Sequence, residues 1–443
     1  MKHVILVTHW TGGDVLPFIR LGGYLVNEGY KVSILTHCVY RQKAESKGLR
    51  FCAVDNEDEY NALSRDLHML SDPISHREDY INFCNTYHGR NRLLREVEMI
   101  ERICDSDSLI IARFRSSISG LLAAEKNSLP YASLILAPNY FSHMELHDQL
   151  MGKELIKEIN SARSSLGLQE IRGWKAWMYS PKHILCGWPE WYASTDETWP
   201  VGAKCIGFLQ DPNMSKEVIY DDVTQFMDKA RNQNKKVLII TGGSSRMVSD
   251  RFYSTAAEAC IFADVFALIV TPFAEYIPKG LPESIKWASN IQLNLILRMA
   301  DGIIHHGGMG TINEAIDAGI PQIVMPHLTD GPDNADRLVH LGLAYKFSPK
   351  QWAPEKIADA IVKMQTDEQK KQCMKYKLLN ANEYDKKPWL YLLPQIKKYE
   401  LPAQQQMEKD TGSIRNEKDI HLTRQQILEL VRKRKEVNNG VTQ

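Results

Sequence analysis

Short apolar runs alternate with amphipathic stretches along the chain, as strands and helices alternate in α/β proteins. The predicted strands of the first half are 3–8, 31–36, 108–112 and 132–136. Those of the second half are 235–240, 264–270, 302–305 and 322–325. Because strands of a parallel sheet are buried on both faces, their apolar runs are continuous, as these are. The pattern therefore indicates an α/β protein with two parallel sheets.

The stretches between these strands predict helices. Pro17 near the start and Gly29 just past the end bound the first one, in keeping with the preference for proline early in a helix and glycine after it. Further helices are expected at 250–262, 311–318 and 333–341. The Pro- and Gly-containing segment 198–214 separates the two series. We predict two Rossmann-like, doubly wound domains that face each other across a cleft, at 1–205 and 215–385, and a C-terminal helix or tail at 386–443.

Two stretches depart from this alternation. Residues 57–104 combine His, Arg and acidic residues with scattered aromatic ones, which suits helices and loops inserted on the cleft side of the first domain better than a plain crossover. Residues 401–443 are polar apart from an amphipathic piece at 422–436. A C-terminal helix and a disordered tail both fit this last segment, and partial order is favoured.

Bulk composition narrows the function classes. The 443 residues are 44% hydrophobic and 24% charged, as in globular proteins, and such a length exceeds one ordinary core. Lys+Arg and Asp+Glu both number 54, and the resulting formal net charge of zero argues against a nucleic-acid binder. The eight cysteines include no CxxC pair and no zinc-type cluster, which predicts reduced thiols in a cytoplasmic protein.

Neither a targeting segment nor a membrane span is visible in the sequence. The only apolar run near the N-terminus is Val4–Val7, which is shorter than a secretory signal requires. No apolar stretch reaches the roughly 18 residues of a membrane-spanning helix. We therefore expect a cytoplasmic protein. A monomer or weak dimer is expected separately, because the sequence does not disclose the oligomeric state.

The most specific feature is Gly302–Glu314, where a strand, a glycine-rich turn and a helix start follow one another. Glycines let backbone N–H groups approach an anion, and the helix adds free amides and its positive dipole end. His306 beside the turn can donate one more hydrogen bond to a phosphate, and such a cradle stabilises a departing diphosphate. Two structural alternatives stay open, because Thr311 and Glu314 also fit a capping box and His305 also fits a packed strand end.

The residues after this helix support the site. Gly319 and Pro321 end the helix, a strand follows, and Asp330 and Asn334 come after that strand. The carboxyl ends of neighbouring parallel strands open on the same crevice. We therefore expect both side chains beside the cradle, where their acceptor groups could hold sugar hydroxyls.

From about Trp287 to Leu341 the chain resembles the nucleotide-sugar signature of the inverting family 1 glycosyltransferases, which have the GT-B fold. The most similar branch contains the antibiotic (vancomycin-type) and sterol glycosyltransferases. This resemblance implies that Glu314 binds the ribose hydroxyls, that Trp287 stacks near the nucleobase, and that Asp330 with Asn334 addresses the sugar. It assigns the diphosphate to His306, Gly307, Gly308, Gly310 and Thr311.

A second donor-side loop, Gly243-Ser244-Ser245, follows the predicted strand 235–240. By the same resemblance, Ser244 or Ser245 reaches the phosphates. One position departs from the family, because Gly331 stands where Gln usually follows the Asp. The lost amide removes a sugar contact, so the sequence leaves open which sugar is used and whether the donor is a UDP or a dTDP sugar.

Near the N-terminus, Gly12-Gly13-Asp14-Val15-Leu16-Pro17 resembles the G-D-x-x-P motif of the same branch, whose Asp faces the acceptor. Other branches use a His five residues before that Pro, where this chain has Gly12. The resemblance thus implies that Asp14 removes the acceptor proton. An ordinary Asp pKa of about 3.9 requires desolvation or late proton loss for this task. Asp14 also fits a cap of a helix starting near Val15, and His9 is either the reserve base or a packed histidine.

Two other signals are weaker. Asp105-Ser-Asp107 imitates the D-x-D metal motif of another glycosyltransferase fold, but it precedes a buried strand and is better explained as a solvated turn. We expect no metal and no other cofactor. Aromatic residues gather at 174–199, where a core role is the default and an acceptor pocket the alternative. They are Trp174, Trp177, Tyr179, Trp188, Trp191, Tyr192 and Trp199.

These features predict an inverting, metal-independent glycosyltransferase. It would move a sugar from a nucleoside diphosphate to a hydroxyl of a small, largely apolar acceptor such as a natural product. A catalytically silent homologue that binds a nucleotide or a partner is an alternative; Asp14 and His306-Gly307-Gly308 argue against it, but Gly331 keeps it open. A nucleotide-sugar 2-epimerase is another, but it needs no acceptor cavity and the G-D-x-x-P motif argues against it.

Overall fold

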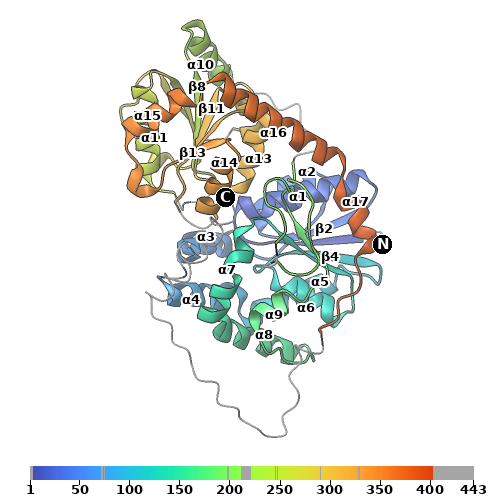
Figure 1. Cartoon of the computed structure of the whole chain (residues 1–443). Coiled ribbons are helices and arrows are strands. Elements are labelled where there is room, and N and C mark those ends of the chain that lie inside the picture. Colours follow the sequence, from blue (N-terminus) through green and yellow to red (C-terminus); the bar gives the residue numbers. More distant parts are fainter. Residues whose placement is uncertain are drawn as a thin grey trace. The chain divides into compact units, whose positions relative to one another are not determined.

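Two parallel β-sheets form the framework of the computed structural model (Figure 1). The described residues are 3–402 except 71, 72, 74, 197, 198, 211–220, 245, 247, 290, 328 and 329. The first sheet has the strand order β3-β2-β1-β4-β5-β6-β7 and the second β10-β9-β8-β11-β12-β13. All these pairings are parallel, as the continuous apolar runs predict.

Eight of the thirteen strands in the described residues lie close to predicted positions, and the other five were not predicted. The strands of the first sheet are β1 (His3–Val7), β2 (Lys31–Thr36), β3 (Arg50–Ala53), β4 (Ser108–Arg113), β5 (Tyr131–Ile135), β6 (Ile184–Cys186) and β7 (Ala203–Cys205). Those of the second are β8 (Val237–Thr241), β9 (Phe266–Val270), β10 (Ile285–Ala288), β11 (Gly302–His305), β12 (Gln322–Val324) and β13 (Ala344–Lys346). The two sheets therefore fall within the predicted domains 1–205 and 215–385.

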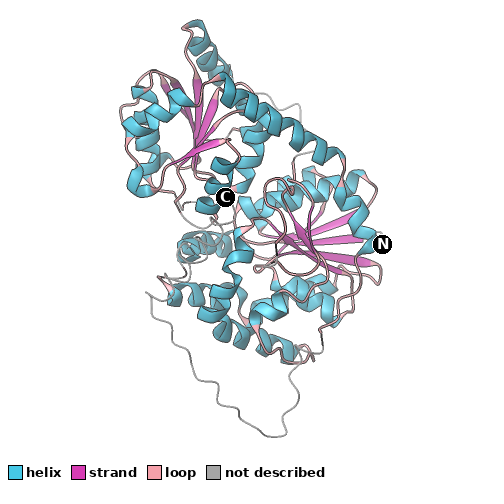
Figure 2. Ribbon diagram, viewed as in Figure 1, coloured by secondary structure: helices cyan, strands magenta, loops and turns pink. Residues whose placement is uncertain are grey.

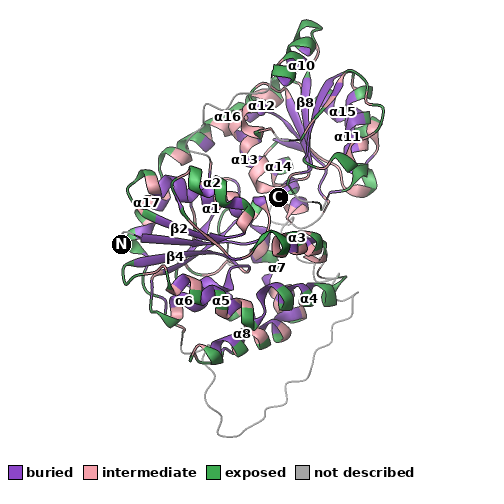
Figure 3. Ribbon diagram, turned by 180° about the vertical axis from the view of Figure 1, so that it is seen from behind, coloured by how far each residue is buried: buried purple, intermediate pink, exposed green. Residues whose placement is uncertain are grey.

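Helices cover the sheets, and the strands between them are largely buried (Figures 2 and 3). In the first part they are α1 (Gly12–Asn27), α2 (Arg41–Ser46), α3 (Glu57–Asp66), α4 (Arg77–His88), α5 (Arg90–Glu101), α6 (Ile118–Lys126), α7 (Asn139–His147), α8 (Lys153–Ser165) and α9 (Trp174–Met178). The second part has α10 (Asp221–Asn232), α11 (Asp250–Phe262), α12 (Leu293–Leu297), α13 (Met309–Ala318), α14 (Gly331–His340), α15 (Pro354–Lys363), α16 (Asp367–Asp385) and α17 (Pro388–Leu392). The insertion at 57–104 is mainly helical, as expected.

The strand order reverses at one place in each sheet, between β1 and β4 and between β8 and β11. In doubly wound sheets, ligands bind at the carboxyl ends of the strands that flank such a switch point. The segments that follow three of these strands contain predicted site residues, with His9 and Asp14 after β1, Ser244 after β8 and His306 after β11. The topology therefore supplies a reason for the position of the predicted site residues.

Two helix starts differ from the predictions. Helix α1 begins at Gly12, so Pro17 lies inside the helix and not in its first turn, and Asp14 is its third residue. Helix α13 begins at Met309 with Gly308 as its N-cap, so Thr311 and Glu314 do not form a capping box. The N-cap of α13 is a glycine, which gives no sharp signal in the sequence, whereas that of α1 is Thr11, which forms a capping box with Asp14.

The described end of the chain packs on the first sheet's domain. Trp389 of α17 is buried, and its ring stacks on Tyr24 of α1 at 5.0 Å between ring centroids. The predicted amphipathic piece 422–436 and Ser245 lie outside the described residues. None of the helices in the described part of the chain combines the length and the apolarity that a bilayer crossing requires.

Candidate active site

The start of α13 carries unused backbone donors. No side chain caps this helix, and Ile312 is the first residue whose N–H bonds back, to Gly308 O at 3.0 Å. None of the described residues accepts a hydrogen bond from the N–H groups of Met309, Gly310 or Thr311. Three amides with the positive end of the helix dipole therefore remain available for an anion.

The His306 ring is wedged between two glycines beside these amides. A Cβ on Gly243, which has φ of +83°, would lie 2.7 Å from His306 Cε1, and a Cβ on Gly308 would lie 2.6 Å from Nε2. His306 Nδ1 is buried and makes no hydrogen bond of good geometry. Burial lowers the pKa of His306 to about 4, although the neighbouring Thr241 backbone raises it. His306 is thus neutral near pH 7 and can offer an N–H to a ligand.

The turn between His306 and Gly308 is held from both sides. Gly307 N–H donates to His305 Nδ1 at 3.1 Å, and Gly307 O accepts from Asn334 Nδ2 at 2.9 Å. His305 is fully buried and its Nε2 lies 3.0 Å from Gln322 Oε1. Burial and the charge of His306 lower the pKa of His305 to about 3, although the bond to Gln322 raises it. His305 is therefore a neutral residue that positions the turn.

Asn334 does not have the role that the resemblance implied. Its side chain is fully buried, its Nδ2 also donates to Asp330 Oδ2 at 2.8 Å, and its Oδ1 accepts from Tyr192 OH at 3.1 Å. An amide with all these partners is not free for a sugar hydroxyl. Asn334 instead orients Asp330, the partly exposed N-cap residue of α14.

The packing of the turn explains why position 331 is a glycine. A Cβ at this position would lie 2.8 Å from His306 O, and a Cβ on Gly307 would lie 3.0 Å from Gly331 Cα. The two backbone segments are so close that a side chain at 331 would displace the turn. The Gln that this branch usually has is therefore excluded by the local packing of this chain.

The resemblance assigns three further residues to the donor, which are Glu314, Trp287 and Ser244. Arg20 Nη2 donates to Glu314 Oε1 at 2.6 Å, so the carboxylate assigned to the ribose already has a cation beside it. Trp287 lies on β10 with 38% of its surface exposed, and its Nε1 donates to Thr271 O at 2.9 Å, which fixes the ring. A Cβ on Gly12 would lie 2.9 Å from Ser244 Oγ, so the turns after β1 and β8 are in contact.

Asp14 sits beside a buried arginine. Its Oδ2 accepts from Thr11 N–H at 3.0 Å and from Thr11 Oγ at 2.8 Å, while its Oδ1 lies 2.6 Å from Arg113 Nη2. The alternative of a helix cap is thus correct in part, because Asp14 completes a capping box from the third helical position and not from the N-cap. Gly13 leaves room here, with only Thr11 Oγ1 at 3.6 Å from a Cβ.

Arg113 is the main site residue that the sequence analysis missed. It ends β4 and is 3% exposed, and its guanidinium lies 4.9 Å from the Trp10 ring centroid and donates to Tyr140 OH at 2.9 Å. The charge of Asp14 raises the pKa of Arg113, although burial lowers it more than any other single cause. The only sequence signal is an arginine directly after a buried apolar strand.

His9 lies inside the domain and not at the surface. It is 2% exposed, with Nδ1 2.9 Å from Ser117 Oγ and Nε2 3.1 Å from Glu96 Oε2. Burial raises the pKa of Glu96, but the charge of His9 and its hydrogen bond outweigh this and lower it. The packed-histidine alternative for His9 therefore fits the structure, and a direct role as acceptor base does not.

Asp105 and Asp107 are at the opposite end of the sheet. They precede the amino end of β4, and Asp105 Oδ1 accepts from Ser108 Oγ at 2.9 Å and from Asp107 N–H at 3.1 Å. Among the described residues, no group of three or more His, Cys, Asp or Glu side chains is arranged to hold a metal ion. The D-x-D resemblance has the local structure of a turn.

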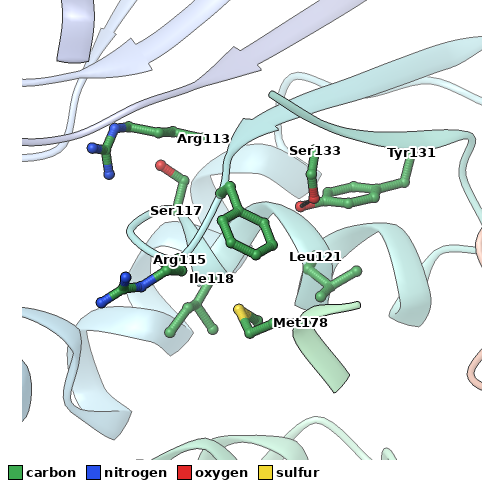
Figure 4. A pocket seen from close by; sticks show the side chains of 9 residues that line it. Arg113, Arg115, Ser117, Ile118, Leu121, Tyr131, Ser133 and Met178 are labelled. Atoms are coloured by element: carbon green, nitrogen blue, oxygen red, sulfur yellow. Dashed lines mark hydrogen bonds between the residues drawn. The ribbon is translucent and has the colours of Figure 1, made fainter. Parts of the chain in front are cut away.

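Most of the aromatic residues between 174 and 199 belong to the core, as the default interpretation predicts. The buried ones are Trp174, Trp177, Trp188 and Tyr192. Tyr179, Trp191 and Trp199 are partly buried and pack against the same core. A small cavity behind β4 is lined by Phe114, Leu121 and Met178, and it has room for about one water molecule (Figure 4).

Comparison with known proteins agrees with the resemblance to the antibiotic and sterol glycosyltransferases. Residues 267–388 match the family model "Erythromycin biosynthesis protein CIII-like, C-terminal domain". The sterol 3-beta-glucosyltransferase of Komagataella phaffii is 23% identical over 374 residues, covering 76% of this chain and 30% of the relative. That of Saccharomyces cerevisiae is 24% identical over 397 residues, covering 80% of this chain and 32% of the relative. This chain thus spans about a third of the length of these relatives.

Solved structures support the fold. The glycotransferase of kitacinnamycin aligns with a TM-score of 0.71 at 16% identity, covering 89% of this chain and 99% of that one. The glycosyltransferase VinC, solved in complex with dTDP, aligns with a TM-score of 0.65 at 18% identity, covering 89% and 99%. The chain has the GT-B fold, and its sequence and structure are similar to those of the antibiotic and sterol glycosyltransferases.

Proposed function

We propose that this chain transfers a sugar from a nucleoside diphosphate to a hydroxyl of a small, largely apolar acceptor, with inversion and without a metal. The observation that carries the proposal is the set of unused donors around His306. The free amides of Met309, Gly310 and Thr311 lie at the positive end of α13. The His306 ring lies against Gly308, directly before them, and its Nδ1 makes no hydrogen bond of good geometry. Donors of this kind bind a diphosphate and stabilise the charge that grows on it as it leaves.

The acceptor side of the reaction is assigned to Asp14. Its carboxylate takes the proton of the acceptor hydroxyl while the oxygen attacks the anomeric carbon from the face opposite the diphosphate. Thr11 donates twice to Oδ2 and Arg113 contacts Oδ1, so it is Oδ1 that keeps a further lone pair for the acceptor. The hydroxyl proton ends on Asp14, and the bonding electrons of the broken bond leave with the diphosphate.

The donor-side roles are those that the family resemblance implies. The partly exposed Glu314 is assigned to the ribose hydroxyls, and Arg20 holds its carboxylate in place. Trp287 offers a half-exposed ring to the nucleobase, and Asp330 addresses the sugar. Gly307 and Gly331 allow the backbone to approach the donor closely, with Asn334 as the residue that positions Asp330.

A direct experiment is to measure nucleoside diphosphate release from UDP and dTDP sugars in EDTA, with and without hydroxylated sterols or aromatic natural products. Release that depends on the acceptor, together with a glycosylated product, supports the proposal. Nucleotide binding without release would favour a catalytically silent homologue, and conversion of the free donor to its 2-epimer would favour an epimerase.

A further inference from the structure

Arg115 lies two residues after Arg113, in the loop that follows β4. It adopts a left-handed conformation with φ of +68°, and so does Trp10 after the neighbouring strand β1, with φ of +86°. Residues other than glycine rarely adopt this left-handed backbone conformation, and those that do are often found at ligand sites. Both therefore mark the switch point of the first sheet, where ligands bind in this type of fold.

The charge of Arg115 is not neutralised by a carboxylate. Its Nη2 donates to Tyr80 OH at 3.2 Å and lies 3.1 Å from His147 Nδ1, and its guanidinium lies 5.6 Å from the Trp174 ring centroid. It forms no ion pair with any carboxylate of the described residues, whereas Arg113 has Asp14. Burial and the charge of Arg115 hold the pKa of His147 well below its ordinary value, so His147 is neutral.

This cation lies close to the proposed reaction centre. Tyr140 has both arginines over its ring, with Arg113 5.5 Å and Arg115 5.2 Å from the ring centroid. Figure 4 shows the two guanidinium groups on the same side of the cavity, turned away from Leu121 and Met178. Asp14 Oδ1 is 2.6 Å from Arg113 Nη2. Contacts therefore run from the proposed base through Arg113 and Tyr140 to Arg115.

Arg115 can receive an anion in its present conformation. The residue is only partly buried, and no described residue accepts a hydrogen bond from its Nε or Nη1. Both nitrogens carry N–H groups that can donate to the oxygens of an oxyanion. Tyr80 and Trp174 are buried and hold the guanidinium in place, whereas the partly exposed Tyr140 offers apolar surface for the body of the same ligand.

We propose that Arg115 forms an anion subsite for the acceptor, so that the preferred acceptor is an apolar hydroxyl compound that also carries an oxyanion group, a carboxylate or a sulfate. That the bound ligand is a sugar acceptor rests on the proposed function, whereas the anion subsite itself is a property of the first domain. An unpaired cation in an aromatic surrounding selects for an anionic ligand because the neutral analogue leaves its charge without a partner.

Matched fluorescent probes test the subsite without a donor. Wild-type protein should bind 1-anilinonaphthalene-8-sulfonate at least about tenfold more tightly than N-phenyl-1-naphthylamine, which lacks the sulfonate, because a charge-assisted hydrogen bond is worth that much. Arg115→Gln should remove the preference, and the exposed control Arg102→Gln should keep it. Displacement by a steroid carboxylate and by an alkyl sulfate then shows which oxyanion binds better.

Equal affinity of the wild type for the two probes, or a preference that survives in folded Arg115→Gln, would overturn the subsite. The wild-type comparison decides even where the variant does not fold. A protein that keeps the charge preference but transfers no sugar to any acceptor would overturn the proposed function and leave the subsite standing.

Discussion

At the scale of single residues, the pairing of Asp14 with Arg113 is the feature with the most consequence. Arg113 is 3% exposed, and a buried guanidinium without its carboxylate is strongly unfavourable. Asp14 also bonds Thr11 at the start of α1. A substitution at Asp14 therefore has a structural effect as well as a chemical one, and the two must be separated.

A pair of variants separates them. Asp14→Asn should lower turnover by about 10²–10⁴-fold, the range for loss of a general base, and should also lower the melting temperature because Arg113 loses its counter-ion. Arg113→Gln breaks the same ion pair but keeps the carboxylate, so it should be destabilised and still turn over within about tenfold of wild type. Equal losses of turnover in the two folded variants would show that Asp14 only holds Arg113.

At the scale of elements, the glycine-rich turn before α13 combines close packing with open space. Gly308 touches the His306 ring, whereas nothing lies within 4 Å of a Cβ on Gly310. Both residues keep their N–H groups when replaced by alanine. The two glycines therefore differ in what a methyl group would displace and not in the donors they offer.

Gly308→Ala should displace the His306 ring and weaken binding of UDP or dTDP by at least about tenfold, the value of one hydrogen bond to a charged acceptor. Gly310→Ala should leave the affinity within about twofold and raise helix stability slightly, since alanine favours a helix over glycine. Titration calorimetry measures both variants. A Gly308→Ala protein with unchanged affinity would mean that the ring position does not matter.

Long apolar runs made the central elements predictable. Strand β11 and helix α11 have the predicted bounds, because runs and periodicity there are uninterrupted. The strands β3, β6, β7, β10 and β13 were not predicted. They have only three or four residues, and tertiary pairing decides them. In the site, glycines and motif residues could be predicted, but Arg113, Arg20 and the burial of Asn334 depend on contacts between distant segments.

At the scale of the whole molecule, buried histidines couple stability to pH. Burial is the largest cause of the lowered pKa values of His88 and His305, to about 3, and of His306, to about 4. In the unfolded chain these side chains titrate near 6.5. Between these values the unfolded chain binds more protons than the folded one, so the free energy of unfolding falls as the pH falls.

Each of these histidines should remove about 2 kcal/mol of stability between pH 7 and pH 5. Urea unfolding at pH 7, 6 and 5 measures this decrease. His88→Phe keeps the stacking on Trp10 but removes one titrating group, so its stability should fall less steeply with pH. An equal slope for variant and wild type would show that His88 is not kept neutral by the fold.

The central claim is that His306 and the start of α13 bind a nucleoside diphosphate without a metal, and calorimetric titration of UDP and dTDP in EDTA tests it most directly. We expect the wild type to bind at least one of the two, and His306→Ala to bind it at least about tenfold more weakly. Binding that disappears in EDTA and returns with Mg²⁺ or Mn²⁺, or an affinity unchanged in His306→Ala, would contradict the account.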